Sequence, residues 1–124
     1  MTRILSVFVF FTSILLPLSS LAGEVSVINT DIKALGGQKY RFNVTLQHQD
    51  AGWDHYADRW EILSPQGTIL ATRTLYHPHV NEQPFTRTLS TTLPAGISSV
   101  TIRGHDSVHG YGDNVLILSL PVSR

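Results

Sequence analysis

The sequence predicts an all-β protein, a seven-stranded antiparallel β-sandwich of the immunoglobulin or fibronectin kind. Three observations support this fold class. Apolar and polar residues alternate with a period of two in seven short segments. Threonine and β-branched residues, which favour strands, fill these segments. Turn signals separate them roughly every dozen residues, as in such sandwiches; a small closed barrel is the alternative arrangement of the same strands.

The first 22 residues are predicted to be a signal peptide, which leaves 23–124 as a single β-sandwich domain. A short basic start precedes an apolar run over 4–16, and Ser20 and Ala22 then occupy the small-residue positions of a cleavage site. The alternative is an anchor that is retained, but the apolar run is shorter than the about 20 residues of a spanning helix. The chain has no cysteine, so a lipid anchor at this cleavage site is excluded.

The first strand is predicted at 24–32 and the second at 40–48. In the second strand, alternate residues are apolar up to the last one, His48, which continues the same inward face. We therefore interpret His48 as a core histidine and not as a ligand. The third strand, 59–63, contains Trp60 near its start, where sandwiches of this kind often bury a tryptophan.

The later strands follow the same alternation and are predicted at 68–76, 85–93, 98–104 and 114–120. The last strand is apolar on both faces over Val115–Leu120. This pattern fits a central strand or a strand that lies beneath a loop.

The six connections between these strands are of two kinds. Three are tight and made of ordinary turn residues, at 35–38, 64–67 and 93–97. Three are long and contain histidine, at 49–58, 77–84 and 105–113. When consecutive strands run antiparallel, odd-numbered connections lie at one end of the fold and even-numbered connections at the other. The long loops are the second, fourth and sixth, so we expect them to meet at one pole.

Every histidine of the chain falls at or near that pole, and several imidazoles beside carboxylates are typical of a divalent transition-metal site. We expect His77 and His79 to form its fixed half, because Pro78 holds His77 extended and both side chains then point the same way. We expect His105, His109 and His55 to complete the site from neighbouring loops, so His77, His79 and His105 should reach one ion.

Carboxylates of the same loops have a supporting role in this prediction. They are either alternative ligands or groups that orient a ligand histidine: Glu82, Asp106 and Asp54. Cysteine is absent and the single methionine lies in the predicted signal peptide, so the mature chain has no sulfur ligand for soft ions such as Cu(I). Zn(II), Cu(II), Ni(II) or Fe(II) fit better, with zinc or copper preferred.

Two other interpretations of the pole remain open. The histidines could form a hydrogen-bonded polar network without a metal. Alternatively, the loops could present a protein- or glycan-binding surface made by Trp53, Tyr56 and Tyr111, as variable domains use their loops.

Charge restricts the partners. Removal of the predicted signal peptide takes away only Arg3, which leaves eight basic and nine acidic residues. A near-neutral domain is a poor partner for nucleic acid or an anionic membrane. We expect a metal ion as the ligand, another periplasmic protein as a second partner, and a location in the periplasm or outside the cell.

Three stretches of the loops resemble an uncharacterised family of short exported bacterial proteins. They are W-D-H-Y-A-D-x-W at 53–60, H-P-H-x-x-E-Q-P-F-T-R at 77–87 and H-D-x-x-H-G-x-G at 105–112. The resemblance covers roughly the last two thirds of the mature chain. It implies export but no particular activity.

The function expected from the sequence is that of an exported metal-binding protein, a carrier, buffer or accessory factor. The first alternative is a small metalloenzyme with one open coordination position. The second is a binding module that uses the same loops.

Overall fold

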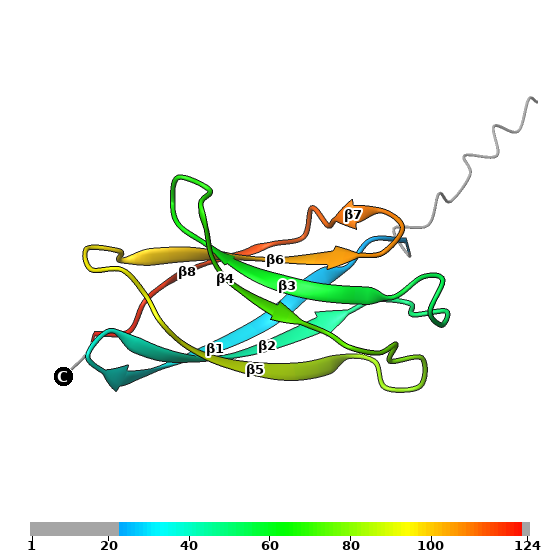
Figure 1. The fold of residues 1–124 in the computed structure, drawn as a ribbon, viewed down its shortest axis with the longest axis horizontal. Coiled ribbons are helices and arrows are strands. Elements are labelled where there is room, and N and C mark those ends of the chain that lie inside the picture. The colour runs from blue at the N-terminus through cyan, green and yellow to red at the C-terminus, as the bar shows by residue number, and fades with distance from the viewer. Residues whose placement is uncertain (1–22, 123–124) are drawn as a thin grey trace, which may run out of the picture.

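The computed structural model describes residues 23–122, and the predicted signal peptide lies outside them. Two antiparallel sheets pack face to face (Figure 1). The three-stranded sheet has the order β1 (Ser26–Gly36), β2 (Lys39–Gln47) and β5 (Phe85–Thr92). The five-stranded sheet has the order β4 (Ile69–Thr74), β3 (Ala57–Leu63), β6 (Ser99–Asp106) and β7 (Gly110–Tyr111), with β8 (Leu116–Ser119) also paired to β6. The predicted all-β sandwich is confirmed.

Residues 23–122 form eight strands and not seven, because the last edge of the larger sheet is broken into two pieces. β7 pairs with the end of β6, and β8 pairs with its beginning. Between them the chain leaves β6 and bonds to the first strand instead, where the carbonyl of Asn114 accepts a hydrogen bond from the N–H of Val27 at 3.0 Å. The predicted last strand is therefore β8, and β7 lies in the segment expected to be loop.

The core consists of the inward-facing residues of both sheets. Phe42, Val44 and Leu46 of β2 face Trp60 and Ile62 of β3, and all five are fully buried. Each such side chain contributes about 1.5–3 kcal/mol when it leaves water. This core explains how a domain without cysteine stabilises its fold.

The histidine-bearing loops meet at one end of the sandwich, as expected. Strand pairing places Leu46 opposite Phe85 and Ala57 opposite Asp106. The loops 48–56, 75–84 and 107–109 therefore emerge together, on the right in Figure 1, while the tight turns lie at the opposite end. We call this end, together with residues 23–25, the histidine pole. Within residues 23–122, no helix has the length and hydropathy needed to cross a membrane.

Candidate metal centre

Three side chains of the histidine pole converge on one point: His48, His55 and Asp106. His48 follows β2 directly and continues its inward face, so its ring is buried in the mouth of the core. Asp106 ends β6, again on the inward face, and is fully buried. His55 comes from the loop between β2 and β3, where its carbonyl accepts a hydrogen bond from Ala51 N–H. Their nearest donor atoms all lie within 4.8 Å of one another, so this set could hold a metal ion.

The distances at this point suit a small divalent ion. His55 Nε2 lies 3.3 Å from Asp106 Oδ1, and His48 Nε2 lies 3.8 Å from Asp106 Oδ2. Ligand atoms of a tetrahedral zinc site with bonds of about 2.0–2.1 Å lie about 3.3 Å apart. The distance from His55 to Asp106 already matches the spacing that an ion would impose, whereas the distance from His48 to Asp106 is about 0.5 Å longer.

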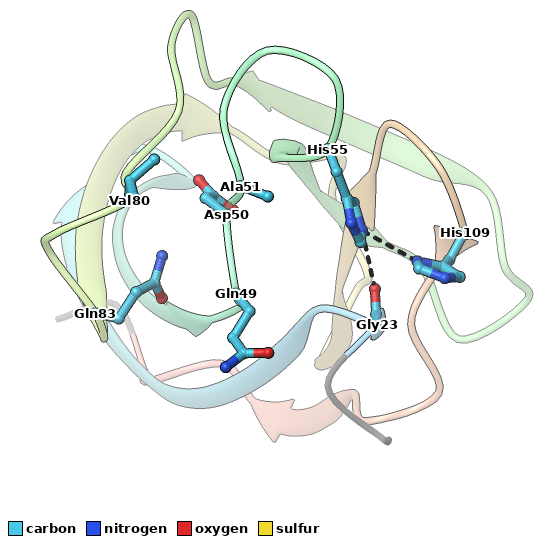
Figure 2. Close-up of a pocket in the computed structure, with 8 residues that line it drawn as sticks. All are labelled: Gly23, Gln49, Asp50, Ala51, His55, Val80, Gln83 and His109. Carbon is cyan, nitrogen blue, oxygen red and sulfur yellow. Dashed lines mark hydrogen bonds between the residues drawn. The ribbon is translucent and has the colours of Figure 1, made fainter. Parts of the chain in front are cut away.

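Two further groups border the same point. His109 Nδ1 lies 3.1 Å from His55 Nε2 and 3.3 Å from Asp106 Oδ1. The carbonyl oxygen of Gly23 lies 3.2 Å from His48 Nε2 and 3.3 Å from His55 Nε2. Figure 2 shows the rings of His55 and His109 and the Gly23 oxygen directed toward one another.

Asp106 is held as an anion. Its Oδ1 accepts hydrogen bonds from the N–H groups of Val108 at 2.9 Å and His109 at 2.6 Å. Burial raises the pKa of this carboxyl, but the two N–H donors and the nearby His48 and His109 outweigh it, so the pKa lies below its usual value. Its Oδ2 is buried and has no hydrogen-bond partner among the described residues. A buried carboxylate oxygen without a donor is costly, and a cation would satisfy it.

Asp50 orients His48. Its Oδ1 accepts hydrogen bonds from His48 Nδ1 at 2.5 Å and from Ala57 N–H at 3.0 Å, and its Oδ2 accepts one from His79 N–H at 2.7 Å. The proton of a neutral His48 therefore lies on Nδ1, and Nε2 carries a free lone pair. A carboxylate behind an imidazole is the usual support of a metal-bound histidine.

That lone pair has no donor to bind. His48 Nε2 faces the carbonyl oxygen of Gly23 and Oδ2 of Asp106, and both are acceptors. Three acceptors that face one another require a proton or a cation between them. The geometry of the donor set thus fits a metal ion.

An open pocket of about 660 Å³ borders the set. His55, His109 and Gly23 lie on one wall, and Asp50, Val80 and Gln83 lie on the other (Figure 2). An ion bound by the set would therefore be reachable from solvent on this side.

A curated protein of Halomicrobium mukohataei, named "Putative lipoprotein", is 39% identical over 95 residues, which are 77% of this chain and 47% of that protein. The chain spans about half the length of this relative. No family model and no solved structure matches the chain.

His77 and His79 lie next to each other but are not members of the converging set. Their ring centroids are 4.7 Å apart. His77 is exposed. His79 is buried, stacks on Phe85 at 4.1 Å, and its Nε2 accepts a hydrogen bond from Arg87 at 2.7 Å. Burial and the Arg87 charge lower the pKa of His79, so the ring is neutral.

His105 has a different partner again. Its Nδ1 lies 2.6 Å from Oδ1 of Asp58, and its ring meets Tyr111 edge to face. Among the carboxylates expected to assist, Glu82 is exposed and pairs with Arg87 at 3.2 Å, and Asp54 is exposed. Ligand roles for His77, His79 and His105 stay predictions.

The aromatic residues expected to form a binding surface are in two places. Trp53 is exposed and packs edge to face on Tyr56 at 5.6 Å. Tyr111 lies instead beneath the guanidinium of Arg103, which is 3.6 Å from its ring centroid.

Sequence reasoning missed one member of the converging set, His48, and two groups beside it, Asp50 and the Gly23 carbonyl. His48 was assigned to the core because it continues an inward face, and it is indeed buried. The last inward position of a strand, however, faces the open mouth between the sheets. The place of His48 at the end of its strand was therefore the feature of the sequence that could have identified it as a site residue. A backbone carbonyl leaves no trace in the sequence.

Proposed function

We propose that this protein is an exported metal-binding protein whose ion is held by His48, His55, His109 and Asp106. The observation that carries the proposal is the fully buried Asp106, whose unpartnered oxygen faces Nε2 of His48, an arrangement that a bound cation would satisfy. The role is that of a carrier, buffer or accessory factor for a divalent transition metal.

The donor set favours Zn(II) or Cu(II). Three imidazoles and one carboxylate supply nitrogen and oxygen ligands alone, and cysteine is absent from the chain. Imidazole suits zinc, copper, nickel and iron, and copper binds most tightly among the divalent ions of the first row.

Two observations support a location outside the cytoplasm. The first is the signal peptide predicted at residues 1–22. The second is the relative named as a lipoprotein, which matches 77% of this chain. The proposed compartment is the periplasm or the cell exterior.

The experiment compares two matched histidine variants of the untagged mature protein purified after export. His55→Asn removes a half-buried member of the converging set, and His77→Asn removes an exposed histidine outside it. Metal content is measured by mass spectrometry, followed by titration with Zn(II), Cu(II), Ni(II) and Fe(II).

We expect near-stoichiometric metal in the wild type and in His77→Asn, and its loss in His55→Asn. Loss in His77→Asn alone would move the site to the loop 75–84. A folded wild-type protein that binds none of the four ions would overturn the proposal.

A second candidate function is a small metalloenzyme, which the pocket beside His55 and His109 favours. Catalysis needs a coordination position open to water. Azide added to the copper-loaded protein would occupy such a position and shift its electron paramagnetic resonance spectrum. An unchanged spectrum would indicate a saturated site and contradict the enzyme hypothesis.

A further inference from the structure

We propose that signal-peptide removal after Ala22 completes the metal site, because the freed α-amino group of Gly23 binds the ion together with the Gly23 carbonyl oxygen. The inference rests on the proposed function and adds a ligand that exists only in the processed protein. Metal loading would then follow export and cleavage.

The carbonyl group of Gly23 lies beside the proposed metal ligands. Its oxygen is 3.2 Å from His48 Nε2 and 3.3 Å from His55 Nε2, so it already borders the donor set. An amine and a carbonyl of the same residue close a five-membered ring around an ion. The residue that follows the predicted cleavage site is thus the residue whose backbone faces the metal.

The segment that follows Gly23 is fixed in the fold by Val25. Val25 is buried, and a Cβ added to Gly104 would lie 2.8 Å from both of its methyl carbons. A Cβ added to Gly112 would lie 1.9 Å from the Val25 carbonyl oxygen. Two glycines therefore form a slot for Val25, and this slot holds Gly23 at the histidine pole.

Residue 23 also has no room for a side chain unless a neighbour shifts. A Cβ at Gly23 would lie 2.7 Å from Cε1 and 2.8 Å from Nε2 of His109. Any side chain here would displace the His109 ring, whose Nδ1 borders the donor set. Glycine at this position thus permits both the close carbonyl and the His109 contact.

Processing changes the chemistry of one atom. In the precursor the nitrogen of Gly23 is an amide, whose lone pair is delocalised, so the neutral group is a very poor ligand for a divalent ion. After cleavage it is an amine, and metal binding itself promotes loss of its extra proton. An additional nitrogen favours Cu(II) in a tetragonal geometry.

The test compares the mature protein, which begins at Gly23, with a form that carries Ala-Ala before Gly23. Both are checked by mass and by melting temperature in chelator, and Cu(II) affinity is measured by competition. Changes around a ligand typically cost about 10–100-fold in affinity, so we expect at least about a tenfold loss in the extended form.

A spectroscopic readout accompanies the affinity. Mature protein with ¹⁵N-glycine should show a changed nitrogen hyperfine coupling to Cu(II), and the extended protein should not. Gly23→Ala, which keeps the amine but displaces His109, should also bind Cu(II) more weakly. Equal affinity and unchanged coupling in mature and extended forms, with binding still lost in His55→Asn, would overturn the inference and leave the proposed function intact. Failure of the mature wild type to bind would overturn both.

Discussion

The two carboxylate oxygens of Asp106 have different roles, one in the fold and one in the proposed metal site. Its Oδ1 accepts two backbone hydrogen bonds, whereas its Oδ2 has no partner among the described residues. One oxygen therefore shapes the loop after β6, and the other is available to an ion. A buried carboxylate oxygen without a donor destabilises the metal-free fold, and a bound cation would remove this cost.

Replacement of Asp106 by asparagine tests this division. Asparagine keeps an oxygen for the two N–H groups, and its amide can donate toward His48 Nε2. We expect the melting temperature in chelator to be maintained or raised, while metal affinity falls at least about tenfold, since a charged ligand is lost. Calorimetric titration and a thermal melt measure the two effects, and unchanged affinity would contradict the assignment.

Asp50 acts as a structural residue beside the site. It accepts hydrogen bonds from His48, from Ala57 N–H and from His79 N–H. Asp50→Ala leaves buried donors unsatisfied, each at a cost of about 1–3 kcal/mol. We expect urea denaturation to show a loss of about 2–4 kcal/mol in the free energy of unfolding. Asp54→Ala, at an exposed carboxylate of the same loop, is the control and should change stability little.

At the scale of elements, the segment before β1 is held in place by β6 and the turn that follows β7. Gly112→Ala places a Cβ against the Val25 carbonyl oxygen, so one of the two backbones must shift. We expect a destabilisation of about 1–3 kcal/mol and weaker metal binding, because Gly23 moves with Val25. Equilibrium denaturation and metal competition measure both effects. Wild-type metal affinity in the variant would show that this segment does not support the site.

The elements themselves could be predicted from the sequence because their alternation is regular. Trp60 and the alternating inward residues of 40–48 predicted the sandwich. Because consecutive strands run antiparallel, the even-numbered connections were predicted to meet at one end. The division of the last strand could not be predicted, since it depends on the Asn114 carbonyl bonding to Val27 across the sheets. His48 is predicted to be a core residue because it continues the inward face of its strand, and it is buried. Only the three-dimensional structure shows that Asp106 lies opposite it.

At the scale of the whole molecule, the outer face of the larger sheet carries an ion-pair network centred on Glu61. Its carboxylate accepts hydrogen bonds from Arg103 at 2.8 Å and Arg59 at 3.1 Å. Burial raises the pKa of Glu61, but the two guanidinium groups outweigh it and lower the pKa below its ordinary value near 4.5. The network joins β3 to β6, the central pair of the sheet.

The sign of the pH dependence follows from this shift. Because the folded state holds Glu61 ionised more readily than the unfolded state, the stabilisation is complete above the ordinary pKa and is lost as pH falls through the folded pKa. Glu61→Gln should cost about 1–3 kcal/mol at pH 7, and its difference from the wild type should shrink below about pH 4.5. Denaturation curves from pH 7 to pH 3 measure it, and a constant difference would contradict the proposed cause.

A bound ion should also stabilise the whole domain. At a free metal concentration 100 times the dissociation constant, the free energy of unfolding should rise by about 2.7 kcal/mol. The rise should appear in the wild type and in His77→Asn but not in His55→Asn. Chelator should reverse it. Equal stabilisation of all three proteins would indicate binding elsewhere.

The most direct measurement is a crystal structure of the metal-loaded mature protein with anomalous scattering at the metal edge. The account predicts one ion bound by His48 Nε2, His55 Nε2, His109 Nδ1 and Asp106, at about 2.0–2.2 Å. An ion held by His77, His79 or His105 instead, or an anomalous map without a peak in the mouth between the sheets, would contradict it.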